Sequence, residues 1–111
     1  MNLDQRDIFQ RAFSFVCDPN RLLQSGDMVE FEGGFKRACS VGWLSHVDRS
    51  ASAVMAPIRE ALDEAAFAAG YADDGIFGFN DSRSHAEVVA LWREVGIAHG
   101  WLDADEMRRA A

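Results

Sequence analysis

The stretch that decides the fold is SHAEVVALWREVGIAHG, residues 84–100. It opens on a Ser-x-x-Glu pattern. The Ser84 hydroxyl can accept a backbone N–H at the start of a helix, and the Glu87 carboxylate can accept the N–H of Ser84 itself. Apolar residues then recur at helical spacing, and a glycine follows. The pattern predicts a helix over residues 85–99 with these residues inward: Val88, Leu91, Trp92, Val95 and Ala98.

Further helices are predicted on both sides of this one. Helical spacing of apolar residues indicates helices over residues 3–16, 35–44 and 53–69, and acidic residues at a start indicate a short one over 104–110. Pro57 must lie in the first turn of its helix, where a missing N–H costs little. The stretch 71–81, with two glycines, is predicted to be a loop. The inward stripe of helix 53–69 is Val54, Ile58, Ala61, Leu62, Ala65 and Ala69.

Residues 21–34 hold two turn signals with a short apolar run between them. Residues 28–31 could form a strand that pairs with Leu22 and Leu23 as a small hairpin, and an irregular loop fits equally well. We therefore expect a mainly α protein: a compact bundle of four to five short helices, with room for one small β-hairpin near residues 21–34. The 111 residues are enough for a single globular domain over 1–111.

The net charge indicates which partners the chain can bind, and the cysteine content indicates the compartment in which it folds. The formal net charge is −7, which disfavours direct binding to nucleic acid or to an anionic membrane and suits a basic protein partner. No stretch has the roughly 20 apolar residues that span a bilayer, and no basic region with an apolar run marks a signal peptide. Two cysteines do not make a disulfide scaffold, so we expect reduced thiols in the cytoplasm.

One candidate site centres on a cysteine. Cys39, with His46 as base and Asp48 to orient it, has the residue types of a thiolate nucleophile. The alternative is that Cys39 is a small buried residue in a packed helix.

The histidines and the remaining carboxylates suggest weaker candidates. His46, His85 and His99 lack the spacing of metal ligands, so we expect no metal site. Asp73 and Asp74 could bind a ligand, together with Asp81, or could simply form turns. No phosphate-binding glycine loop is present, and no cofactor is expected.

Aromatic residues could form a partner surface. Trp101 follows a helix end and is the one most expected to be partly exposed, where it could contact a protein partner or a second copy of the chain. Otherwise it belongs to the core.

Two segments together resemble a known family. Residues 38–44, ACSVGWL, carry a C-x-x-G-x-L pattern, and residues 80–88 are NDSRSHAEV. In order and separation they resemble an uncharacterised bacterial and phage family, domain of unknown function 6197, over about residues 26–99. The resemblance implies no activity. It does single out six residues: Cys39, Gly42, Asn80, Asp81, Ser84 and Glu87.

The sequence therefore favours a small acidic protein-interaction or regulatory module without catalysis, such as a phage or mobile-element accessory or inhibitor protein. The alternative is a small cysteine-dependent enzyme that uses Cys39 with a histidine base.

Overall fold

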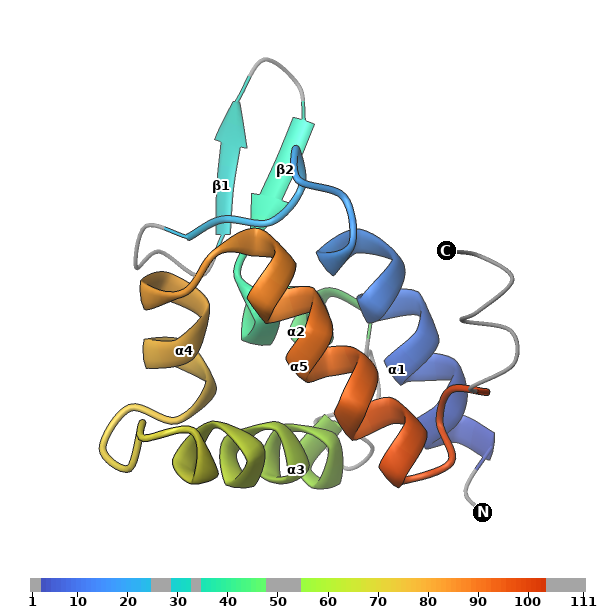
Figure 1. The fold of residues 1–111 in the computed structure, drawn as a ribbon. Helices are drawn as coiled ribbons and strands as arrows, with labels where there is room; N and C mark the ends of the chain where they lie inside the picture. Colours follow the sequence, from blue (N-terminus) through green and yellow to red (C-terminus); the bar gives the residue numbers. More distant parts are fainter. Residues whose placement is uncertain (1–2, 25–28, 33–34, 48–54, 104–111) are drawn as a thin grey trace.

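The computed structural model of the protein describes residues 3–24, 29–32, 35–47 and 55–103. In these ranges, five helices surround one apolar core, and a two-stranded hairpin projects from the bundle (Figure 1). The mainly α bundle with a small hairpin is confirmed. The elements are α1 (Leu3–Val16), β1 (Val29–Glu32), β2 (Phe35–Ala38), α2 (Ser40–Val47), α3 (Met55–Ala68), α4 (Ile76–Ser82) and α5 (His85–Ala98).

The core lies where α1, α2, α3 and α5 meet. Phe9 of α1 packs against both Trp92 of α5 and Trp101, with ring centroids 5.2 Å apart in each pair. Trp43 of α2 stacks on Phe15 at 4.1 Å and donates its indole N–H to the Arg21 carbonyl. These large aromatic surfaces supply much of the hydrophobic stabilisation of a small domain.

The helix α5 forms where it was predicted, and four of its five predicted inward residues are buried, whereas the fifth, Ala98, is exposed. The Ser84 hydroxyl accepts the Glu87 N–H at 3.2 Å, and Glu87 Oε1 accepts the Ser84 N–H at 3.3 Å, so both halves of the capping box are formed. The helix ends at Ala98, and Gly100 adopts a positive φ of 76°.

The helices α1 and α3 are also where the sequence places them. Pro57 lies in the first turn of α3, and Gly70, with φ of 105°, follows its end. The first residues of the predicted helix 53–69 and the whole of the predicted helix 104–110 lie outside the described residues.

The hairpin differs from its prediction. The strand β1 pairs in antiparallel fashion with β2, with Val29 opposite Ala38. Residues 35–38 were predicted to begin a helix and are instead this second strand. Ala38 also exchanges backbone hydrogen bonds with the 21–23 segment, through the Arg21 carbonyl and the Leu23 N–H. Leu22 and Leu23 therefore lie beside β2 and not beside β1.

The prediction of a loop over residues 71–81 is wrong from residue 76 onward, because residues 76–82 form α4. A side chain from another helix supplies the missing start signal: Asp63 Oδ1, on α3, accepts the Ile76 N–H at 2.9 Å. Gly75 precedes the helix with a positive φ of 58°. Burial of Ile76, Phe79 and Asn80 then holds α4 against the bundle.

Candidate functional site

Cys39 is buried and stands at the start of α2. Its side chain is 3 % exposed, its carbonyl accepts the Trp43 N–H, and its Sγ accepts the Gly42 N–H at 3.4 Å. This is the geometry of a helix N-cap, with sulfur in the place of the usual oxygen. Burial raises the pKa of the Cys39 thiol more than these backbone N–H groups lower it. An activated nucleophile needs the opposite shift and access to solvent.

The proposed base for Cys39 is engaged with aromatic rings. The His46 ring lies edge-on to Trp43 at 5.3 Å and to Phe15 at 6.1 Å. Asp48, the third member of the predicted group, lies outside the described residues. The geometry of the described part therefore favours a structural role for Cys39.

The two segments that carry the family resemblance, residues 38–44 and 80–88, are joined at a buried asparagine through Ser40. Asn80 is completely buried, and its Oδ1 accepts both the N–H of Ser40, at 3.0 Å, and the Ser40 hydroxyl, at 2.8 Å. Its Nδ2 donates to the Leu23 carbonyl at 2.8 Å and to Asp81 Oδ1 at 3.0 Å. The Trp92 indole N–H completes the chain by donating to the Ser40 hydroxyl at 2.9 Å. We call these residues the Asn80 cluster.

The Asn80 cluster is saturated. An asparagine amide can accept two hydrogen bonds and donate two, and all four are made here. It joins α4 to α2, α5 and the 21–24 segment, where Gln24 adds bonds to the carbonyls of Asn80 and Arg83. The side chain of Asn80 therefore has no hydrogen-bonding position left for a ligand. Because its bonds connect separate elements, the role of the cluster is to hold the fold together.

The prediction that Trp101 is partly exposed is wrong. Gly100 turns the chain back, so that the Trp101 N–H donates to the Gly96 carbonyl at 2.7 Å and the indole becomes 4 % exposed. Its ring stacks on His99, with centroids 4.7 Å apart. The Trp101 carbonyl accepts Nε2–H of Gln10. Trp101 therefore closes the core and offers little surface to a partner.

The remaining candidates do not form a metal-ligand cluster among the described residues. Asp73 and Asp74 are exposed in the turn before α4. His85 places Nε2 2.9 Å from the Val16 carbonyl, and because a carbonyl only accepts, Nε2 carries the proton. In the described part of the chain, no three His, Cys, Asp or Glu side chains gather as metal ligands would.

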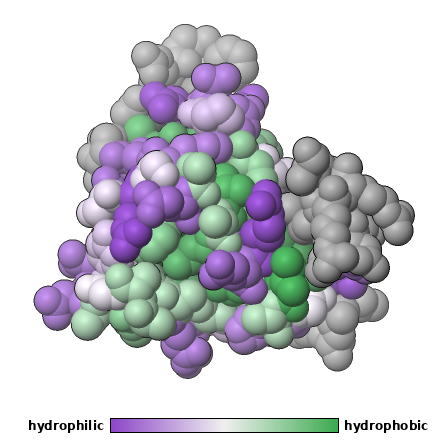
Figure 2. All heavy atoms as spheres, viewed as in Figure 1, coloured by the Kyte–Doolittle hydropathy of each residue, from purple (hydrophilic) through white to green (hydrophobic). Residues whose placement is uncertain are grey.

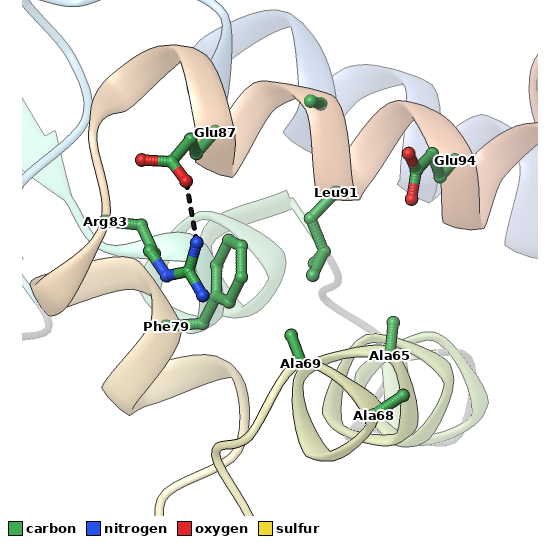
Figure 3. Close-up of a pocket in the computed structure, with 9 residues that line it drawn as sticks. Ala65, Ala68, Ala69, Phe79, Arg83, Glu87, Leu91 and Glu94 are labelled. Carbon is green, nitrogen blue, oxygen red and sulfur yellow. Dashed lines mark hydrogen bonds and ion pairs between the residues drawn. The ribbon is translucent and has the colours of Figure 1, made fainter.

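The site that the sequence did not predict is a groove between α3 and α5. Its main hollow has a volume of about 430 Å³, and a second of about 330 Å³ adjoins it, sharing Ala65 and Glu94. Figure 3 shows Ala65 of α3 and Ala69, just past the end of α3, pointing toward Leu91 and Glu94 of α5, and Ala68 lines the same hollow. In Figure 2, apolar residues gather over α3 and the seam beside α5, with charged residues among them. We call these two hollows together the α3–α5 groove.

The α3–α5 groove is closed at its α4 end by an ion pair. Arg83 Nη1 lies 2.7 Å from Glu87 Oε2, and Arg83 Nε donates to the Tyr71 hydroxyl at 3.0 Å. The guanidinium covers the Phe79 ring at 5.2 Å from its centroid. The hydrogen bond from Arg83 is the main cause that lowers the pKa of the Glu87 carboxyl, and those from Ser84 lower it further.

The other end of the groove carries carboxylates without such a partner. Glu64 of α3 and Glu94 of α5 are both exposed and line it. Within residues 3–24, 29–32, 35–47 and 55–103, neither has a cationic nitrogen within 4.0 Å. In the part of the chain that the structure describes, the groove therefore combines alanine walls with carboxylates that have no ion-pair partner at one end.

The sequence signal that relates to this groove is the row of alanines in the predicted helix 53–69. The stripe of helix 53–69 was predicted to face inward along its whole length. In the structure Ala61 is buried, Ala65 is half-buried and Ala69 is exposed. The stripe thus leaves the core along α3, and its last residues line the groove.

Comparison with known proteins gives no match to a family model, a curated protein or a solved structure. The family resemblance of residues 38–44 and 80–88 therefore stays a prediction. Among the described residues, no helix has the length and apolar character needed to cross a membrane.

Proposed function

We propose that this chain is a non-catalytic protein-interaction module that binds its partner in the α3–α5 groove. The observation that carries the proposal is the groove itself. Its walls are alanines at exposed or half-buried positions, and small side chains on two adjacent helices let another segment approach closely.

The charge of the chain supports a basic protein partner. A net charge of −7 attracts a cationic surface and repels phosphate-rich ligands. Glu64 and Glu94 bring part of that charge to the groove. An accessory or inhibitor role in a phage or mobile element, in the cytoplasm, fits this proposal and rests on the sequence alone.

The enzyme alternative has less support. It requires a reactive thiol at Cys39, and that thiol is buried, caps a helix and has a raised pKa.

The proposal is tested by affinity capture from a lysate of the source cell, with matched variants as baits. Ala68→Trp fills the groove at an exposed position of α3. Ala56→Trp makes the same change at another exposed alanine of α3, which does not line the groove. The proposal requires a protein retained by wild type and Ala56→Trp and lost with Ala68→Trp, with equal thermal melts for all three baits. Equal capture by all three would contradict it.

A further inference from the structure

We infer that the occupant of the α3–α5 groove is an amphipathic helix of a partner protein, with large aliphatic residues on its buried face and arginine or lysine where it meets Glu64 and Glu94. This inference rests on the proposed function and specifies the chemistry of the partner.

The first argument is the backbone of the groove walls. Both walls are helices, so along them the peptide groups of α3 and α5 already bond within their own helix. An extended peptide would find no free strand edge there and would bury its own peptide groups without partners. A helix satisfies its backbone internally and needs only side-chain contacts.

The second argument is the size of the wall residues. Ala65 and Ala68 of α3, Ala69 just past its end, and Ala90 and Leu91 of α5 line the main hollow together, and four of these five side chains end at Cβ. Helices with small residues at their contact can pack with their axes about 8 Å apart, at the short end of the usual range. A third helix can therefore insert large aliphatic side chains between α3 and α5, where it would meet Leu91 and Phe79.

Ile97 extends the apolar surface on the α5 side. It is one of the large apolar side chains left exposed, at 40 % of its surface. It follows Ala90 by seven residues and Glu94 by three, so it lies on the same side of α5. A helix long enough to reach past Glu94 would cover part of it.

The third argument is the uneven charge along the groove. At the α4 end, Glu87 is already paired with Arg83. At the other end, Glu64 and Glu94 have no cation within 4.0 Å among the described residues. Covering these carboxylates without a counter-charge is costly, whereas arginine or lysine on the occupant would neutralise them. The occupant therefore needs its basic residues at this end.

The charge also argues against a second copy of this chain as occupant. Two molecules of net charge −7 repel each other, and each would bring further acidic side chains to Glu64 and Glu94. A nucleic acid is disfavoured for the same reason.

The test uses a displayed library of helical peptides of about 18 residues, about 27 Å long, with varied apolar and charged faces. Peptides are selected on wild-type protein and their affinities measured against variants. We expect selected peptides to be enriched in arginine and lysine beside an aliphatic stripe. We also expect Glu94→Lys and Glu64→Lys each to weaken binding on the order of tenfold. Asp73→Lys makes the same change of charge at an exposed turn position that does not line the groove, and it should change affinity by less than about twofold.

The outcomes separate the two proposals. If Ala68→Trp lowers the affinity of none of the selected peptides, the groove is not the binding surface and the proposed function fails. A second outcome is that Ala68→Trp abolishes binding but the charge reversals leave the affinity unchanged, or a central proline in the peptide has no effect on it. The groove is then the binding surface, but the inference that its occupant is a basic helix is overturned. Selection of acidic helices by the Glu64→Lys, Glu94→Lys double variant would support the inference independently.

Discussion

The side chain of Asn80 ties three segments of the chain together. It is fully buried, all four of its hydrogen-bonding positions are used, and its partners belong to α2, α4 and the 21–24 segment. A sequence can mark such a residue only as polar and preceding a helix. Its three-dimensional partners lie 40 and 57 positions away from it, so its role had to come from the structure.

Replacing Asn80 should therefore destabilise the protein strongly. Asn80→Ala leaves the Ser40 N–H and the Leu23 carbonyl without partners, and each such group costs about 1–3 kcal/mol. It also removes the acceptor of the Ser40 hydroxyl, which keeps only the bond that it accepts from Trp92. We expect a loss of about 3 kcal/mol in the free energy of unfolding, measured in urea. Asn20→Ala, at an exposed position, should stay within about 0.5 kcal/mol of wild type. Equal effects from both would contradict the structural role of Asn80.

The two thiols should differ in reactivity. Cys17 is exposed and Cys39 is buried, and desolvation raises the pKa of both thiols. With a colourimetric disulfide reagent at neutral pH, one thiol of the native protein should react, more slowly than free cysteine because less thiolate is present. Cys17→Ser should leave no rapidly reacting thiol until the protein is unfolded. Rapid labelling of Cys39 in the native state would revive the enzyme alternative.

Glu87 should make stability depend on acid pH. Folding lowers the pKa of its carboxyl from the ordinary value of 4.5, because Arg83 and Ser84 bond to its charged form. Its contribution is therefore complete above the pKa of the unfolded chain and is lost as the pH falls through the lower folded pKa. The melting temperatures of wild type and Glu87→Gln should differ at pH 7, and the difference should disappear as the pH falls through the folded pKa of Glu87. A difference that persists in acid would mean that the charge of Glu87 is not its cause.

Among the elements, α5 and α4 show what local sequence can and cannot predict. The helix α5 carries its own start signal, in Ser84 and Glu87, so a window of a few residues was enough. The helix α4 receives its start from Asp63, 13 residues earlier on α3, and its N-cap residue Gly75 makes no side-chain bond. The strand β2 likewise depends on pairing with two segments. Elements that depend on distant partners were the ones predicted wrongly.

Gly96 of α5 tests the packing of helices against one another. A Cβ there would lie 2.6 Å from both Phe9 and Leu102. Helix propensity alone predicts that Gly→Ala stabilises a helix by about 1 kcal/mol. Because overpacking costs about 1–3 kcal/mol, we expect Gly96→Ala to destabilise the protein in a chemical denaturation experiment.

The matched control is Ala90→Gly, at an exposed position in the interior of α5. It should cost about 1 kcal/mol through propensity alone. If Gly96→Ala stabilises the protein by the same amount, α1 and the chain after Gly100 do not approach α5 as closely as described.

For the molecule as a whole, the apolar content and spacing predicted a helical bundle, and the bundle is present. The groove could not be predicted from the sequence, because Ala61, Ala65 and Ala69 give the same pattern whether they face the core or a binding surface. Only the placement of α5 decides where the stripe leaves the core. The net charge of −7 predicts a positively charged partner, and part of this negative charge lies in the groove, on Glu64 and Glu94.

The most direct test of the α3–α5 groove is to map the backbone amide NMR shifts of the protein as a selected basic helical peptide is added. We expect the largest shifts at Ala65, Ala68, Ala90 and Glu94, with little change in β1, β2 and α2. The same titration with Ala68→Trp should give no saturable shifts. Shifts concentrated on the hairpin or on α2 would contradict the assignment of the binding surface to α3 and α5.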